Sequence, residues 1–339
     1  MLDLGGTGYL GLQNDPEWLG LVQKYLQKYG TNHPISRLNQ HSDFEILHQV
    51  EAYLAMQLGC EAACLFSSGF LSGLAVARFT AEKAFEAQSV LWLPDNHHPC
   101  LAPPVGWKAL PIDPQHSDSP SINTQAIAFA QTIDPIFGDP DPSIDHSVYR
   151  QASLRVLDVS HSIGLWNHQP WVNSQTLVTG SLGKAWAFPA GFIAGSQKLV
   201  TAIQQAGTFC ASAPPSIAFA SAFLEFSQTR ERLQRQLSEL LDSINHHWNL
   251  PSNPEQLCPI YNLGQHSPAL KSTLEGLGYH MSWLQYPTPT SPLYVRQVFK
   301  ANHSPVAIQA LLEWLDHQGL APQKTPASFE AHYYFPPSP

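Results

Sequence analysis

The residue best suited to covalent chemistry in this chain is Lys184, which lies in the apolar stretch VTGSLGKAWAFPAGFIAG at residues 178–195. Small residues precede it, and Trp186 and Phe188 follow it. An ammonium group loses hydration in such surroundings, which lowers the lysine pKa and makes the neutral amine a nucleophile towards carbonyls. A lysine of this kind can hold an aldehyde cofactor as a Schiff base. The alternative is a lysine that snorkels from a partly buried loop.

A second group of polar side chains follows the strand predicted at 154–158. The segment LDVSHSIG places Asp158 at the end of that strand and His161 three residues later. A carboxylate at a strand end can serve a metal, a base or a pyridinium ring. The alternative is an aspartate that caps a turn.

The stretch Ser67–Phe70 joins a predicted strand at 62–66 to a helix of small residues. A strand, a Ser/Gly turn and a helix N-terminus favour an anion, because free backbone amides and the helix dipole face it. The alternative is an ordinary N-cap by a serine. His97 and His98 follow the predicted strand 90–93, at the sheet edge where open α/β sheets bind ligands. A solvated histidine pair is the alternative there.

Composition excludes several classes of function. The chain has 339 residues, enough for two domains, with 43% hydrophobic and only 13% charged residues. A net charge of −9 argues against binding to nucleic acid or to anionic membranes. No run reaches transmembrane length, and no leader opens the sequence. Five cysteines without a CxxC spacing indicate reduced thiols of a cytoplasmic protein, and the sixteen histidines form no metal motif.

Hydrophobic periodicity predicts the elements that position these residues. Helices are expected at 17–29, 43–58, from 197, over 216–247 with a break near Gln228, at 268–277 and at 304–314. Strands are expected at 62–66, 90–93, 126–130, 154–158, 176–179 and 192–195, with shorter ones between 250 and 299. Residues 111–150 are expected to be irregular around one strand, and the Pro-rich tail from 321 irregular.

The order of these motifs resembles the fold-type I pyridoxal phosphate enzymes. It is most similar to the α-oxoamine synthases, the group of 8-amino-7-oxononanoate synthase and glycine C-acetyltransferase within the class I/II aminotransferase superfamily. The similarity runs from Tyr9–Leu12 to the final helix, and LDVSHSIG and TGSLGKA are its most specific parts. It implies an α/β fold: a mostly parallel seven-stranded sheet between helices, with a smaller α+β C-terminal domain. It implies a large domain of residues 21–235 and a small domain of residues 236–339, which the N-terminal segment 1–20 joins.

The resemblance implies roles at a pyridoxal 5′-phosphate site. Lys184 matches the lysine that binds the cofactor and later acts as acid and base at the substrate's α-carbon. Asp158 matches the aspartate that pairs with the pyridine nitrogen and keeps the ring an electron sink. His161 matches the histidine hydrogen-bonded to the phenolic oxygen. His98, in preference to His97, matches the histidine that stacks on the ring.

The remaining matches concern the phosphate and the substrate. The residues that match phosphate contacts are Ser68, Gly69, Phe70 and Ser181, with Ser212 as the candidate contact from a partner subunit. Arg296 matches the late arginine that grips the amino acid's carboxylate, a bidentate task suited to guanidinium. The site is therefore expected at the interface of a homodimer.

Departures from the family pattern spare the cofactor core and fall on the acyl-donor side and the subunit contacts, where Cys210–Ala211–Ser212 replaces the Ser-Thr before the proline pair. The glycine-rich segment before Ser36 reads GTNHPI, Val159–Ser160 replaces Glu-Ala, and Gly138 stands where a serine is expected. The reaction implied is the condensation of a small amino acid with an acyl-CoA. The alternatives are an aminotransferase on the same cofactor and a non-catalytic homologue that serves as a scaffold.

Overall fold

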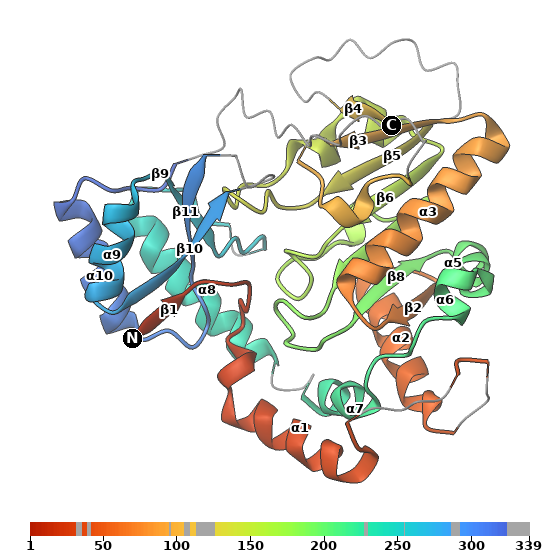
Figure 1. The fold of residues 1–339 in the computed structure, drawn as a ribbon, viewed down its shortest axis with the longest axis horizontal. Coiled ribbons are helices and arrows are strands. Elements are labelled where there is room, and N and C mark those ends of the chain that lie inside the picture. The colour runs from red at the N-terminus through yellow and green to blue at the C-terminus, as the bar shows by residue number, and fades with distance from the viewer. Residues whose placement is uncertain are drawn as a thin grey trace.

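The computed structural model of the chain describes residues 1–31, 36–38, 42–94, 96–104, 109–112, 126–226, 230–253, 255–285 and 292–323 (Figure 1). Residues 32–35 of the altered glycine-rich segment, Asp95 and the expected helix break near Gln228 lie outside these ranges. The same holds for the tail from residue 324.

The larger of the two sheets has seven strands in the order β2-β8-β7-β6-β5-β3-β4. The strands are β2 (Ala62–Phe66), β3 (Val90–Pro94), β4 (Ala109–Ile112), β5 (Ala126–Gln131), β6 (Leu154–Asp158), β7 (Thr176–Ser181) and β8 (Gly191–Gly195). The strands β4, β3, β5, β6 and β7 are adjacent in this order and pair in parallel. Strand β8 runs antiparallel to both β7 and β2. The prediction of an α/β fold with a mostly parallel sheet is confirmed.

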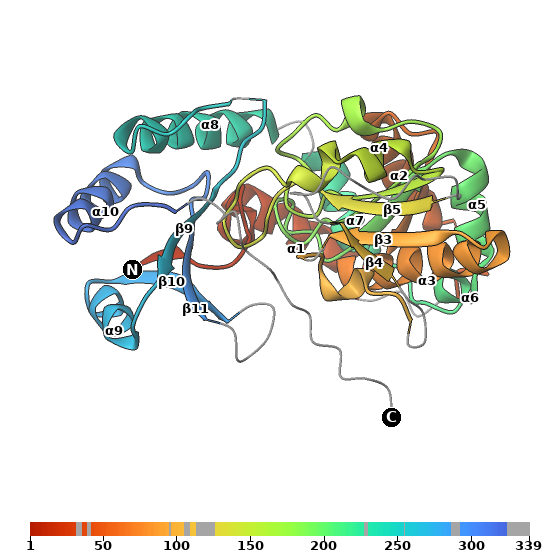
Figure 2. The same ribbon diagram turned by 90° about the horizontal axis from the view of Figure 1, so that it is seen from above.

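Helices cover both faces of this sheet. They are α1 (Pro16–Tyr29), α2 (Phe44–Leu58), α3 (Gly69–Ala87), α4 (Ser147–Gln151), α5 (Gln197–Gln205), α6 (Gly207–Cys210) and α7 (Ile217–Phe226). Successive residues of β5 alternate between two apolar cores, with Ala128 on the side of α2 and α7 and Phe129 on the side of α3. Figure 2 shows β3 and β5 between α4 on one side and α3 on the other. The short α4 lies in a region that was expected to be irregular, since five residues carry too little periodicity to be recognised.

A second sheet has four strands in the order β1-β10-β11-β9. They are β1 (Leu2–Leu4), β9 (Ile260–Gln265), β10 (Tyr279–Gln285) and β11 (Leu293–Val298). The helices of this half are α8 (Arg230–His247), α9 (Pro268–Gly276) and α10 (Pro305–His317). β1 comes from the start of the chain and pairs in parallel with β10, so the two ends of the sequence share one sheet.

Local signals explain why the helices lie where the periodicity placed them. The Asp15 side chain accepts hydrogen bonds from the backbone amides of Glu17 and Trp18 and so caps α1. Gly59, at a φ of 68°, ends α2 in the left-handed conformation that glycine adopts without strain. The Ser68 hydroxyl accepts from the Leu71 amide and caps α3.

Candidate active site

The carboxyl ends of several strands bring the predicted residues to one edge of the large sheet. Because β5, β6 and β7 are parallel, their last residues lie side by side: Asp158 ends β6 and Ser181 ends β7. Ser68 follows β2, and His98 follows β3 and precedes the short 3-10 helix Pro99–Leu101. Segments more than a hundred residues apart in the sequence therefore converge at one site.

Lys184 lies just after β7 and points at His161. Its Nζ atom is 2.7 Å from His161 Nε2. Burial lowers the pKa of Lys184 to about 8, with Asp158 opposing this shift and Arg296 adding to it. A neutral amine is therefore accessible a little above neutral pH, as the apolar surroundings in the sequence predicted.

His161 has contacts through both ring nitrogens. Its Nδ1 atom is 2.6 Å from the hydroxyl of Tyr9, a residue of the N-terminal segment that is completely buried. Burial, and then the positive charges of Lys184 and Arg296, lower the pKa of His161 well below its usual range. The imidazole is therefore neutral at physiological pH.

Asp158 is 8% exposed, and its Oδ1 accepts a 2.8 Å hydrogen bond from the backbone amide of Ser160. Burial lowers the pKa of His98, an effect that Asp158 opposes and Lys184 reinforces. Asp158 and Lys184 therefore lie close enough to His98 for their charges to affect it.

The two neighbouring histidines after β3 differ in what they contact. His97 Nδ1 lies 2.6 Å from the carbonyl oxygen of Pro94, so this ring turns back towards its own strand. His98 Nδ1 lies 3.0 Å from Cys100 Sγ, and its ring meets Phe70 edge-on at 6.4 Å. His98 therefore lies near Asp158 and the N-terminus of α3, and its stacking on a cofactor ring stays a prediction.

The N-terminus of α3 approaches the end of β7 very closely. A Cβ atom built on Gly69 would lie 2.5 Å from Ser181 Cβ and 2.9 Å from Ser181 Cα, so only glycine fits there. The first amides of a helix have no intrahelical acceptor, and here they open beside the Ser181 hydroxyl. Phe70 contributes its backbone to this turn, and the residue is 56% exposed.

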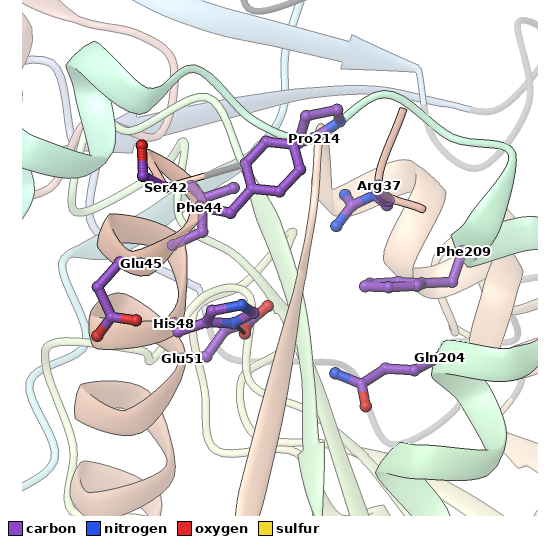
Figure 3. Close-up of a pocket in the computed structure, with 10 residues that line it drawn as sticks. Arg37, Ser42, Phe44, Glu45, His48, Glu51, Gln204, Phe209 and Pro214 are labelled. Atoms are coloured by element: carbon purple, nitrogen blue, oxygen red, sulfur yellow. Dashed lines mark hydrogen bonds and ion pairs between the residues drawn. The ribbon is translucent and has the colours of Figure 1, made fainter. Parts of the chain in front are cut away.

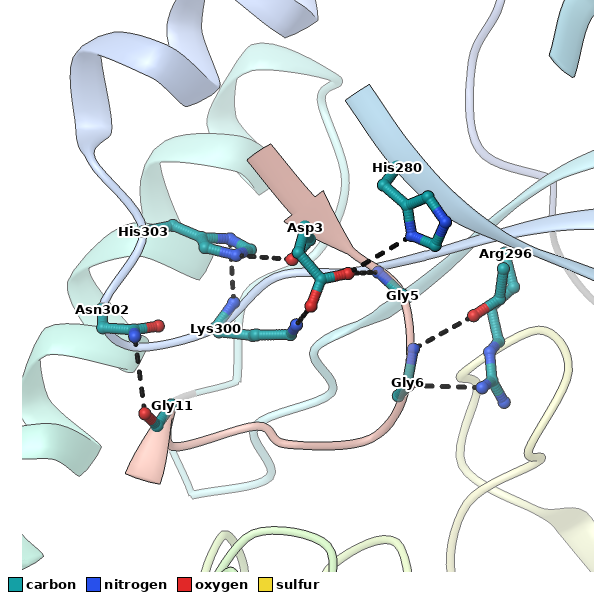
Figure 4. A network of polar contacts seen from close by, with 10 residues as sticks. Asp3, Gly5, Gly6, Gly11, His280, Arg296, Lys300, Asn302 and His303 are labelled. Carbon is teal, nitrogen blue, oxygen red and sulfur yellow. Dashed lines mark hydrogen bonds and ion pairs between the residues drawn. The ribbon is translucent and has the colours of Figure 1, made fainter. Parts of the chain in front are cut away.

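Arg296, on β11, spans the space between the two sheets. Its guanidinium donates to the Pro135 carbonyl at 2.7 Å and to the Gly6 carbonyl at 3.3 Å, although only 8% of the residue is exposed. Figure 4 shows it beside a polar cluster in which Lys300 Nζ lies 2.7 Å from an Asp3 carboxylate oxygen. A cavity of about 370 Å³ adjoins this cluster and extends to Gly183 and Ala187, on either side of Lys184.

Ser212 is not brought into this group. Its hydroxyl donates to the Phe209 carbonyl at 2.9 Å, and its own carbonyl accepts from Arg37 Nε at 3.1 Å. Within the described part of the chain, no recorded contact connects Ser212 with the Lys184 cluster. It lies instead near a larger hollow of about 620 Å³, which is lined by residues of α2 together with Arg37, Gln204, Phe209 and Pro214 (Figure 3).

The sequence did not predict which loop groups hydrogen-bond to His161 and Arg296. Tyr9 was noted only as part of a matching stretch, and the carbonyls of Gly6 and Pro135 carry no side-chain signal. Gly138, where a serine was expected, has a reason in the fold: at a φ of 81°, an added Cβ would lie 2.1 Å from the Ile260 carbonyl oxygen. A larger residue is excluded there by the backbone of β9.

The groups at this edge fit a phosphorylated aldehyde cofactor. The glycine-only approach at Gly69 leaves a cradle for a phosphate, and a lysine of lowered pKa lies close enough to a buried carboxylate to interact with its charge. Among the described residues, no group of three His, Cys, Asp or Glu side chains is arranged to hold a metal ion. In the same ranges no helix is both long and apolar enough to cross a membrane.

A mostly parallel sheet with a lysine, an aspartate and two histidines at its carboxyl edge defines the class of fold-type I pyridoxal phosphate enzymes. The model of the family described as aminotransferase class I and II matches residues 146–315, half of the chain. The chain belongs to this family, and it is a transferase that depends on pyridoxal 5′-phosphate.

Within this family, the chain is similar to proteins named 8-amino-7-oxononanoate synthase. The chain is 25% identical to 8-amino-7-oxononanoate synthase of Hahella chejuensis, over 91% of this chain and 84% of that protein. It is 29% identical to 8-amino-7-oxononanoate synthase of Ectopseudomonas mendocina, over 93% and 87%. The structure of Sphingomonas wittichii serine palmitoyltransferase superposes with a TM-score of 0.75 at 15% identity, over 94% of this chain and 86% of that one, which shows a shared fold.

Proposed function

We propose that this enzyme condenses a small amino acid with an acyl-CoA thioester, as an α-oxoamine synthase of the 8-amino-7-oxononanoate synthase type. The observation that carries the proposal is the pairing of Lys184 with His161 at the sheet edge where Asp158 ends its strand. Relatives that bear the name 8-amino-7-oxononanoate synthase along almost the whole chain support the reaction.

The phosphate of the cofactor would be held by four groups of this chain. The amides of Gly69 and Phe70 and the hydroxyls of Ser68 and Ser181 face the phosphate position, at the positive end of the α3 dipole. When bound, pyridoxal phosphate supplies an aldehyde for Lys184 and a ring that accepts electrons from the substrate's α-carbon. Asp158 keeps a negative charge where the ring nitrogen would lie, and His98 lies beside the ring.

The side chains around that position would perform the proton chemistry. Above about pH 8 the Nζ atom of Lys184 carries a lone pair, so it can take a proton from a substrate carbon and later return it. His161 would donate a hydrogen bond from Nε2 to the phenolic oxygen of the cofactor. Arg296 would bind the carboxylate of the amino acid. The contacts that Arg296 makes with Gly6 and Pro135 hold it ready for that task.

We further propose that the enzyme is a cytoplasmic homodimer with its site at the subunit interface. Ser212 would then reach the phosphate of the partner's site. All five cysteines are free thiols in the structure, which agrees with a reducing compartment.

The test is the product formed from an amino acid and a panel of acyl-CoA thioesters. A synthase releases free thiol only when both substrates are present, and its activity selects one amino acid and one acyl donor. An aminotransferase instead yields a 2-oxo acid from the amino acid without an acyl donor. Formation of the 2-oxo acid, or of neither product, would overturn the proposal.

A further inference from the structure

Tyr9 brings the N-terminal segment into contact with the catalytic histidine. Its side chain is completely buried, and its hydroxyl lies 2.6 Å from His161 Nδ1. The other ring nitrogen, Nε2, lies 2.7 Å from Lys184 Nζ. One imidazole therefore bridges a phenol and an amine through two short hydrogen bonds.

The imidazole can donate in only one of these bonds at a time. Burial and the neighbouring positive charges lower the pKa of His161 and keep the ring neutral. A neutral imidazole carries a single hydrogen, so one nitrogen donates while the other accepts. The group bonded to the donating nitrogen must therefore accept, and the group bonded to the other nitrogen must donate.

The protonation of Lys184 decides which arrangement holds. An ammonium group has donors and no acceptor, so it donates to Nε2, and the ring hydrogen must then lie on Nδ1 and point at the Tyr9 oxygen. A neutral amine can accept from Nε2–H, and the Tyr9 hydroxyl then donates to Nδ1. Burial raises the pKa of Tyr9, so its hydroxyl keeps a hydrogen in both states.

We propose that Tyr9 is a positioning residue whose hydroxyl holds His161 in the tautomer that matches the charge on Lys184. The inference rests on the roles proposed above for Lys184 and His161. Between the two states only one proton leaves the trio, the one lost by Lys184 to solvent or substrate. With Tyr9 as donor, Nε2 carries the hydrogen and faces the site, where it can donate to an oxygen anion of the cofactor ring.

Groups from several elements face this trio and set the pH of the change. They are Asp158 at the end of β6, His98 and Cys100 after β3, Arg296 on β11 and Cys258 before β9. Asp158 raises the pKa of Lys184 and Arg296 lowers it. These charges fix the pH at which the amine becomes neutral. Once it is neutral, the Tyr9 hydroxyl, which stays uncharged, donates to Nδ1 and so keeps the ring hydrogen on Nε2.

The direct test is nitrogen NMR of the full-length, cofactor-free protein with labelled histidine, from pH 6 to pH 10. The His161 signals are assigned by their absence in His161→Gln. In the native protein the protonated and unprotonated nitrogens should exchange identity with a midpoint near pH 8, without a doubly protonated ring. A tautomer that stays the same across this range would overturn the proposal.

Tyr9→Phe removes the hydroxyl and keeps the ring volume. Above about pH 8 both His161 nitrogens should move to intermediate shifts in this variant, because a neutral amine can donate or accept and no phenol then donates to Nδ1. Below that pH the Lys184 ammonium should still keep the ring hydrogen on Nδ1. The matched control is Tyr149→Phe: the Tyr149 hydroxyl is buried in α4 and has no hydrogen-bond partner among the described residues. Its His161 signals should equal those of the native protein. Native-like signals in Tyr9→Phe would also overturn the proposal.

The cofactor-loaded enzyme gives a second readout. We expect Tyr9→Phe to lower kcat about tenfold and to leave KM for the amino acid within about twofold, because the phenol acts through His161 and not on the substrate. The NMR result does not depend on the reaction. If native His161 changes tautomer and Tyr9→Phe loses the selection, but no thiol is released, the proposed reaction fails and the role of Tyr9 stands.

Discussion

At the scale of single residues, two lysines of this chain have different neighbours and therefore different roles. Lys300 is almost completely buried, but it lies 2.7 Å from the Asp3 carboxylate and so remains half of an ion pair. Lys184 faces a neutral imidazole instead, and burial then lowers its pKa to about 8. The lowered pKa makes Lys184 an available nucleophile near neutral pH.

The amine of Lys184 should therefore titrate well below an ordinary lysine. In the cofactor-free protein we expect its rate of reductive methylation to rise through pH 8, as the neutral form appears above the lowered pKa. Asp158 favours the ammonium, so Asp158→Asn should move the midpoint to lower pH. The peptide that contains the exposed Lys271 provides an internal reference, and a Lys184 midpoint near pH 10 would contradict this reading of the site.

Arg296 should contribute to the binding of the amino acid. Arg296→Ala is expected to raise KM for the amino acid by an amount equivalent to about 2–5 kcal/mol, because the substrate carboxylate loses a buried partner. Arg296→Lys should recover only part of the lost binding energy, since an ammonium cannot reproduce a bidentate contact. Steady-state kinetics at saturating acyl donor measure both, and an unchanged KM in Arg296→Ala would remove this residue from the site.

At the scale of elements, the site depends on how closely the α3 N-terminus approaches the end of β7. Gly69→Ala should weaken cofactor binding by about tenfold or more, because the new Cβ meets the backbone of Ser181 and pushes the amides away from the phosphate. Titration of the cofactor-free protein with pyridoxal phosphate gives the Kd. The control is Gly20→Ala in α1, where nothing lies within 4 Å, so a helix-favouring residue should leave the Kd unchanged. An unchanged Kd in Gly69→Ala would refute the proposed phosphate cradle.

The sequence was sufficient to predict the elements that carry strong local signals. The strands that lead to Asp158 and Lys184 are short apolar runs, and α1 and α2 have periodic apolar faces that place their ends within a residue or so. The serine turn before α3 marked the start of that helix, but no local signal marked its end at Ala87. The contacts of Arg296 and Tyr9 could not be predicted, because they depend on backbone carbonyls and on residues over a hundred positions away. Such contacts follow from how the two sheets meet, which no local pattern encodes.

At the scale of the whole molecule, the first residues connect the two halves. We propose that 1–20 and 236–339 form the small domain and 21–235 the large one. The pairing of β1 with β10 and the Asp3–Lys300 ion pair support the assignment of the first segment. The boundary near residue 235 falls within α8, which is the element that leads from one half to the other. Tyr9 then reaches back to His161 in the large domain, so the orientation of the two halves affects the active site directly.

The homodimer proposed above should form through the face around the start of α3. Leu74 is 41% exposed there, four residues after Phe70, whereas Phe85 is 76% exposed about 16 Å further along the same helix. Sedimentation should give twice the 37.4 kDa of one chain. Leu74→Glu should weaken the association about a hundredfold or more, because a carboxylate would lose hydration at the interface, while Phe85→Glu should remain dimeric. If Ser212 of the partner contributes to the phosphate site, Leu74→Glu must also lose affinity for pyridoxal phosphate as it dissociates. A native protein that sediments as a monomer with full cofactor affinity would show that one chain builds the site alone.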